Sequence, residues 1–112
     1  MKKIEAIIRP TKVGDVCDAL NKLGHPGIMI TEIEGHGKQK GIEQEFHGKT
    51  YKTELLSKAK LEVVVNDRDL DKTIQAIREA AFTGKVGDGK IFVYSVDNVI
   101  RIRTDEKGEL AV

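Results

Sequence analysis

The feature that most constrains this chain is an internal repeat. The segment KKIEAIIRP near the start aligns with KAKLEVVVND at an offset of 57 residues, and the helical patterns that follow keep that offset. Each half has a β-branched apolar run, then apolar residues at helical spacing, then a second strand, at about 28–35 and 90–94. Two such βαβ halves predict an α+β, ferredoxin-like sandwich with an antiparallel sheet and both helices on one face. The aligned pairs are Ile4 with Leu61, Glu5 with Glu62, Ile8 with Val65, Val13 with Leu70, Cys17 with Ile74, Leu20 with Ile77 and Gly27 with Gly84.

The strand patterns leave the other face of the predicted sheet without a covering layer. Alternation divides the apolar strand residues into a helix-facing set and an outward set. The helix-facing set is Ile4, Ala6, Ile8, Val63 and Val65, and the outward set is Ile7, Val64 and Val93. An apolar sheet face left open indicates an interface. The alternating run 98–104 predicts a further strand that completes this interface.

Composition narrows the setting. A chain of 112 residues with 39% hydrophobic content suits one globular domain, small enough to have reason to oligomerise. Its 19 basic and 18 acidic side chains give a net charge of +1, which leaves no basic footprint for nucleic acid. The lone Cys17 excludes disulfide frameworks and zinc sites. No signal peptide or membrane-length apolar run is apparent, so we expect a cytosolic protein.

The segment TGKVGDGKIFVY, residues 83–94, concentrates glycine and positive charge before an apolar run. The spacing Gly84-x-x-x-x-Gly89-Lys90 matches the start of a P-loop, but Ile91 replaces the Ser or Thr and a strand replaces the helix. The segment is therefore no Walker A motif. Two interpretations stay open: a nest of N–H donors for an anion, or a tight turn whose glycines supply positive φ.

Residues 37–55 between the two halves have no sustained periodicity. Loops of this length within a compact domain are usually functional or disordered, so the segment is either a partner-binding arm or a floppy hairpin. Phe46 and Tyr51 favour the arm, because a solvated tip gains nothing from apolar side chains without a partner. Gln39, Lys40 and Lys58 flank its two roots.

Arg101 and Arg103 alternate with isoleucines, so as a strand they would project from one face, a geometry suited to bidentate phosphate contacts. With Lys90 and the Gly-rich turn, they could converge on a polyphosphate; the alternative is a solvated edge strand. His25, His36 and His47 lack metal-ligand spacing, and no catalytic triad or carboxylate pair is apparent. Chemistry on a substrate has no candidate base.

These motifs resemble the PII signal-transduction family, the nitrogen-status sensors of bacteria, archaea and plastids. Residues 83–93 fit the family's C-terminal signature, and Gly35-x-Gly37-x-Gln39-Lys40-Gly41 and Arg101-Ile102-Arg103-Thr104 support the resemblance. It implies a non-enzymatic homotrimer that binds ATP or ADP in clefts between subunits and senses 2-oxoglutarate through Mg²⁺-ATP. It also implies a T-loop, about 37–55, that docks on nitrogen-assimilation enzymes, regulators or an ammonium channel, the last bringing the protein to the membrane periphery.

The resemblance also implies roles for single residues. A B-loop, about 82–90, would wrap the nucleotide phosphates, and a C-terminal segment would span about 102–112. The implied nucleotide site is Ile7, Met29, Gly35, Gly37, Lys38, Glu62, Val64, Gly87, Asp88, Gly89, Lys90, Arg101 and Arg103. Gln39 resembles the Mg²⁺ ligand, Lys58 the partner of the distal 2-oxoglutarate carboxylate, and Lys40 and Gly41 backbone contributors. Tyr51 occupies the position that many bacterial members nucleotidylate.

Two departures from the family pattern bear on function. Met29 stands where many members have a threonine near the adenine, which affects ATP against ADP preference. The tip reads Phe46-His47-Gly48-Lys49-Thr50-Tyr51, and Lys49 replaces a serine that some members phosphorylate. A small ATP-hydrolysing or phosphoryl-transfer protein would use the same phosphate cradle, but would also need a residue that orients the nucleophile. A ferredoxin-like RNA binder would need aromatic residues on its central strands.

Overall fold

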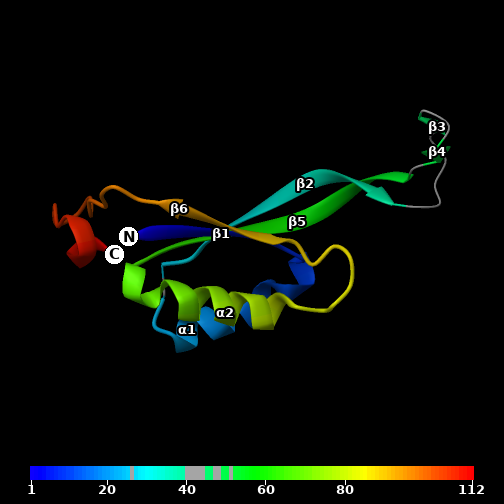
Figure 1. Ribbon diagram of the computed structural model, residues 1–112. Helices are drawn as coiled ribbons and strands as arrows, with labels where there is room; N and C mark the ends of the chain where they lie inside the picture. The colour runs from blue at the N-terminus through cyan, green and yellow to red at the C-terminus, as the bar shows by residue number, and fades with distance from the viewer. Residues whose placement is uncertain (26, 40–44, 47–48, 51) are drawn as a thin grey trace.

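Four antiparallel strands form one sheet in the order β2-β5-β1-β6, and both helices lie on one side of it (Figure 1). The computed structural model describes residues 1–25, 27–39, 45–46, 49–50 and 52–112. The main elements are β1 (Lys2–Ile8), α1 (Val13–Lys22), β2 (Met29–Gln39), β5 (Lys52–Val65), α2 (Leu70–Ala81) and β6 (Lys90–Ser95). The minor elements are the 3-10 turns η1 (Pro10–Lys12), η2 (Asp67–Asp69) and η3 (Gly108–Ala111), and the paired two-residue strands β3 (Glu45–Phe46) and β4 (Lys49–Thr50).

This strand order confirms the predicted α+β, ferredoxin-like arrangement. The strands that begin the two halves, β1 and β5, lie side by side in the centre, and the strands that end the halves lie at the edges. Each half passes through a 3-10 turn into its helix, η1 into α1 and η2 into α2. The sequence repeat is therefore a repeat of strand, helix and strand in space.

The core lies between the sheet and the two helices. Ile4 and Leu61 from the central strands meet Leu20 and Ile77 from the helices, and all four are fully buried. Buried helix residues recur at helical spacing because one stripe of each helix meets the sheet. The other buried apolar residues are Ala6, Ile8, Val16, Ala59, Val63, Val65 and Ala81. All five strand residues predicted to face the helices belong to this core.

The assignment of Val93 to the open face is wrong. Val93 pairs directly with Ile4 across β1 and β6, and directly paired residues share a face of the sheet, so Val93 lies on the helix side. The strand β6 has four apolar residues in succession, 91–94, so alternation alone does not assign their faces. Ile7 and Val64 do alternate with buried neighbours, as predicted.

The open face carries charge as well as apolar surface. Glu62 on β5 accepts from Lys3 on β1 at 2.6 Å and pairs with Lys60 at 3.7 Å. The hydrogen bond from Lys3 holds the pKa of the Glu62 carboxyl below its usual value and raises that of the Lys3 ammonium. The predicted apolar interface is thus a mixed surface with an ion-paired centre.

The extra C-terminal strand predicted over 98–104 is not formed. Ile100 makes a single isolated bridge with Lys107, and the chain turns back between them. The N–H of Asp105 donates to the carbonyl of Arg101 at 2.8 Å, and the N–H of Arg101 donates to the carbonyl of Glu106 at 2.9 Å. The turn prevails because it satisfies these backbone groups locally, whereas a strand there would need a neighbouring edge.

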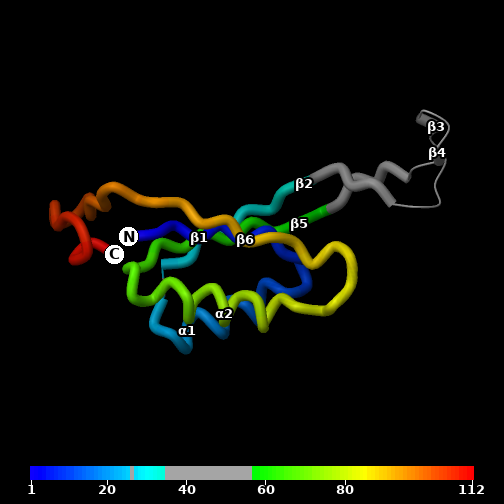
Figure 2. The backbone as a smooth tube through the Cα atoms, in the orientation of Figure 1, coloured from blue at the N-terminus to red at the C-terminus, as the bar shows by residue number. Residues whose placement is uncertain are grey.

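The long loop is shorter than its aperiodic sequence suggests. β2 continues to Gln39 and β5 starts at Lys52, and these two residues pair with each other. In Figure 1 the paired ends of β2 and β5 leave one end of the sheet, and the backbone trace in Figure 2 shows both chain termini at the other end. The two strands pair here although their side chains show no apolar alternation, because the hydrogen bonds of a strand pair join backbone groups that every residue except proline carries.

Candidate functional site

The B-loop joins the end of α2 to the start of β6, and its conformation depends on glycine. Gly84, Gly87 and Gly89 have φ of 84°, 104° and 101°, which residues with a side chain rarely adopt. At Gly89 the reason is also steric, since a Cβ there would lie 1.7 Å from the carbonyl oxygen of Ile7. The loop thus passes directly against the end of β1.

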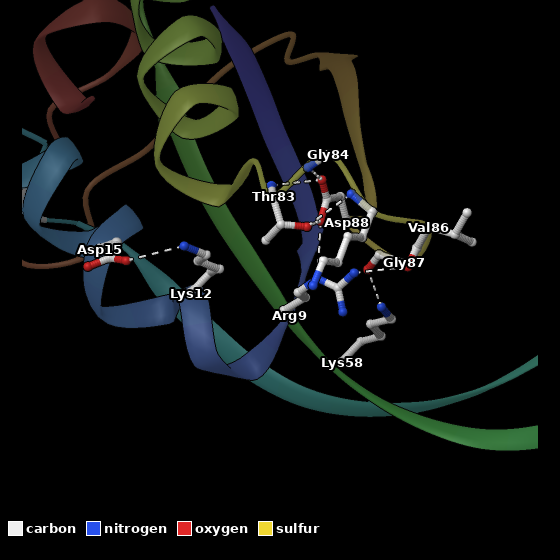
Figure 3. A network of polar contacts seen from close by, with 10 residues as sticks. Arg9, Lys12, Asp15, Lys58, Thr83, Gly84, Val86, Gly87 and Asp88 are labelled. Atoms are coloured by element: carbon white, nitrogen blue, oxygen red, sulfur yellow. Dashed lines mark hydrogen bonds and ion pairs between the residues drawn. The ribbon is translucent and has the colours of Figure 1, made fainter.

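The Asp88 carboxylate holds the B-loop closed. It accepts from the N–H groups of Thr83 and Gly84, each at 2.9 Å, and from the hydroxyl of Thr83 (Figure 3). Arg9 Nε donates to the same carboxylate at 3.1 Å. The Thr83 hydroxyl, with these other donors, holds the pKa of Asp88 far below its usual value. Since its oxygens serve the loop itself, Asp88 shapes the site through its side chain, and only its backbone is left to meet a ligand.

Two basic side chains from outside the B-loop, Arg9 and Lys58, donate hydrogen bonds to its backbone. Arg9, which follows β1, donates through Nη2 to the carbonyl of Val86 at 2.9 Å, and Lys58 Nζ on β5 donates to the carbonyl of Gly87 (Figure 3). Arg9 was not among the residues predicted from the sequence. A topological signal existed: antiparallel pairing of β1 with β6 brings the residue after β1 to the loop before β6.

The predicted nucleotide-site residues that line two cavities form two separate groups. Ile7, Asp88, Gly89 and Lys90 line a cavity of about 250 Å³ between the B-loop, α2 and the sheet. A second cavity, of about 530 Å³, is lined by the other group, Met29, Val64 and Arg101, together with the C-terminal residues Ala111 and Val112.

The predicted convergence of Lys90 and the B-loop with Arg101 and Arg103 does not occur within one chain. The loop precedes β6 and the arginines follow it, so the length of the strand separates them, and they lie at opposite ends of the sheet (Figure 1). Arg101 pairs instead with Glu106 at 3.2 Å, and Arg103 lies exposed in the adjoining turn. The two groups can contact one ligand only if two chains contribute.

The remaining predicted residues lie along β2 and β5. Gly35, Gly37, Lys38 and Gln39 follow one another on β2, with Gly37 paired to Glu54 and Gln39 to Lys52. Glu62 lies on the open face in its ion pair with Lys3. The predicted roles of Lys40, Gly41 and Tyr51 fall on residues outside the described part of the chain.

Comparison with known proteins identifies the family. Residues 1–106 match the profile of the family described as "Nitrogen regulatory protein P-II". The chain belongs to the P-II family. A P-II protein of Pasteurella multocida is 52% identical over the full length of both chains, and one of Methanothermobacter thermautotrophicus is 49% identical over all of this chain and 97% of its own. The crystal structure of Arabidopsis thaliana PII bound to citrate superposes with a TM-score of 0.82 at 39% identity, covering 99% of this chain and 91% of that one.

The P-II match spans both groups of predicted site residues, from Ile7 through the B-loop to Arg101 and Arg103. The relatives are named as regulatory proteins, in agreement with a signal-transduction role. Within the described ranges of the chain, no helix is both long and apolar enough to cross a membrane.

Proposed function

We propose that this P-II protein reports nitrogen status by binding ATP or ADP and, together with Mg²⁺-ATP, 2-oxoglutarate. The observation that carries the proposal is the B-loop, a preformed turn of glycines whose carbonyls are held by cations and which is followed by Lys90. Such a turn directs backbone N–H groups toward an anion, the arrangement that binds phosphate. A shaped loop therefore fits a polyphosphate better than a simple turn does.

The nucleotide site lies between subunits of a homotrimer. The separation of the two residue groups supports this, since the Lys90 group of one chain needs the Arg101 group of another to surround one ligand. A mixed apolar and charged face such as the open sheet face suits burial against further copies. Arg101 and Arg103 of the neighbouring chain then supply counter-charge to the phosphates, and Met29 and Val64 contact the base.

The effector site lies where the T-loop meets the B-loop. Gln39 ends β2, and Lys58 reaches from β5 to the carbonyl of Gly87. Gln39 with the nucleotide phosphates would hold Mg²⁺, which supplies the charge that binds the keto acid; Lys40 and Gly41 contribute backbone groups, and Lys58 pairs with the distal carboxylate. Ligand binding at these roots changes the T-loop, and with it the affinity for a nitrogen-assimilation enzyme or an ammonium channel. Tyr51 is the candidate for covalent modification on that loop.

A phosphoryl-transfer enzyme is the second candidate, and the geometry disfavours it. The carboxylate of the B-loop, Asp88, is engaged by Thr83, Gly84 and Arg9, and its lowered pKa makes it a weak base. We therefore assign a sensor without turnover. We further propose that it acts in the cytoplasm and reaches the membrane only through a channel partner.

Calorimetry with ATP, ADP and 2-oxoglutarate, each with and without Mg²⁺, tests this function. ATP and ADP should bind alone, and 2-oxoglutarate only with both Mg²⁺ and ATP, because ADP lacks the γ-phosphate that helps to hold the metal. Lys58→Met should abolish most keto-acid binding and leave ATP bound. Binding of 2-oxoglutarate without ATP, or steady release of phosphate from ATP, would contradict the sensor.

A further inference from the structure

The two cations that touch the B-loop contact consecutive carbonyl groups. Arg9 holds the carbonyl of Val86 and Lys58 holds the carbonyl of Gly87. The Arg9 guanidinium also lies against Gly87, where a Cβ would come within 3.2 Å of Nη2. Two peptide groups in succession are thus each fixed by a charged donor.

Fixing a carbonyl fixes the N–H of the next residue. No peptide bond in the described chain is cis, and in a trans peptide the C=O and N–H point in opposite directions. The carbonyl of Val86, held by Arg9, therefore turns the N–H of Gly87 away from Arg9. In the same way, Lys58 turns the N–H of Asp88 away from itself.

These two N–H groups are available to a ligand. Among the hydrogen bonds within the described part of the chain, neither the N–H of Gly87 nor that of Asp88 has an acceptor, whereas those of Thr83, Gly84 and Lys85 are all used inside the loop. Adjacent free N–H groups in a turn form a concave anion site.

We propose that Arg9 and Lys58 are positioning residues that aim the N–H groups of Gly87 and Asp88 at a nucleotide phosphate. This rests on the proposed nucleotide-binding function and adds the contacts that orient the two N–H donors. The planar guanidinium of Arg9 makes both contacts at once: Nε donates to the Asp88 carboxylate while Nη2 donates to the carbonyl of Val86. A lysine at position 9 keeps the charge but lacks the planar pair of donors.

Amide NMR of the ligand-free protein tests the positioning directly. Arg9→Lys should move the amide resonance of Gly87 most, and Lys58→Met that of Asp88 most, since each cation holds a different peptide. Lys12→Met is the matched control, because Lys12 lies near Arg9 but pairs with Asp15 at 3.7 Å and does not touch the loop (Figure 3). If the amide resonances of Gly87 and Asp88 do not change in folded variants, the proposal is overturned. If Arg9→Lys does not fold, Lys58→Met is sufficient for the test.

Calorimetry with ATP and with adenosine then separates positioning from general stability. Both loop variants should reduce the preference for ATP over adenosine by about tenfold, the size expected for one misaligned hydrogen bond to a charged group, and leave adenosine affinity unchanged. Equal losses for the two ligands, or an unchanged preference, would refute the positioning role alone. A parent protein that binds ATP no better than adenosine would refute the proposed nucleotide function, and the positioning role with it.

Discussion

Replacing Gly89 by alanine should unfold the junction between the B-loop and the sheet. An alanine Cβ would lie 1.7 Å from the carbonyl oxygen of Ile7 and 2.8 Å from its carbon, both backbone atoms of β1. Neither atom can rotate away as a side chain can. Relief requires the start of β6 to move from β1, which breaks the pairing of Ile7 with Lys90.

The stability lost in Gly89→Ala can be estimated from two contributions. A side chain at φ of 101° costs about 1–3 kcal/mol as backbone strain. Losing one or two ladder hydrogen bonds adds about 1 kcal/mol for each. We expect Gly89→Ala to lower the free energy of unfolding by about 2–5 kcal/mol, a large part of the stability of a small domain.

Two other glycines calibrate the measurement. Gly84→Ala places a Cβ at φ of 84° against only the Phe82 ring, 3.3 Å away, so strain alone should cost about 1–3 kcal/mol. Gly14→Ala lies in α1 with no atom within 4 Å and should stabilise the protein by up to about 1 kcal/mol. Urea unfolding at one protein concentration gives all three values. A Gly89→Ala variant no less stable than Gly84→Ala would refute the steric argument.

Three further substitutions test the rest of the structure. Asp105 is the one residue other than glycine with positive φ in the described chain, at 59°, so Asp105→Gly should raise the free energy of unfolding by about 1 kcal/mol in urea titrations. The pKa of Asp88 is lowered in the folded protein, so the ionised carboxylate stabilises the fold above pH 3.8, the carboxyl pKa in the unfolded chain, and this stabilisation is lost as the pH falls further. Asp88→Asn should therefore have a lower free energy of unfolding than the parent at pH 7, and the difference should shrink in acid. Glu106→Gln should tighten ATP binding severalfold by calorimetry, because Glu106 occupies the guanidinium of Arg101; unchanged affinity would mean that this pair does not compete with phosphate.

The topology was predictable because the repeat fixes it. Two copies of one strand-helix pattern allow few arrangements, and the alternation in β1 and β5 is clear enough to place Ile4 and Val65 in the core. The face of Val93 was not predictable, since its strand is apolar throughout. The turn at 101–106 was missed because alternation describes side chains, whereas the backbone there found hydrogen bonds within its own segment.

The site was predictable in its parts and not in its geometry. The glycine spacing points to the B-loop, but the sequence does not show that Asp88 bonds inward or that Arg9 crosses from the end of β1. Contacts of this kind join residues 79 positions apart and arise only when the sheet forms. Residues chosen for motif membership alone therefore omit the side chains that hold the motif in shape.

The antiparallel sheet makes a final prediction about assembly. Lys90 starts β6 and Arg101 follows it, so both can reach one nucleotide only from different chains. Trimers of Lys90→Ala or of Arg101→Ala alone should bind ATP weakly in every cleft. In a mixed trimer with two chains of one variant and one of the other, roughly one cleft in three receives an intact Lys90 and an intact Arg101 from neighbouring chains, if the trimer is cyclic.

Refolding an equal mixture of the two variants should therefore restore tight ATP binding at about a quarter of the clefts, since about three quarters of randomly assembled cyclic trimers are mixed. Calorimetric stoichiometry reports this fraction, and an equal mixture folded separately and then combined is the control. Recovery to this level requires that each site be shared by two chains. No recovery, from variants that both form trimers, would mean that Lys90 and Arg101 do not share a nucleotide, and the site between subunits would have to be abandoned.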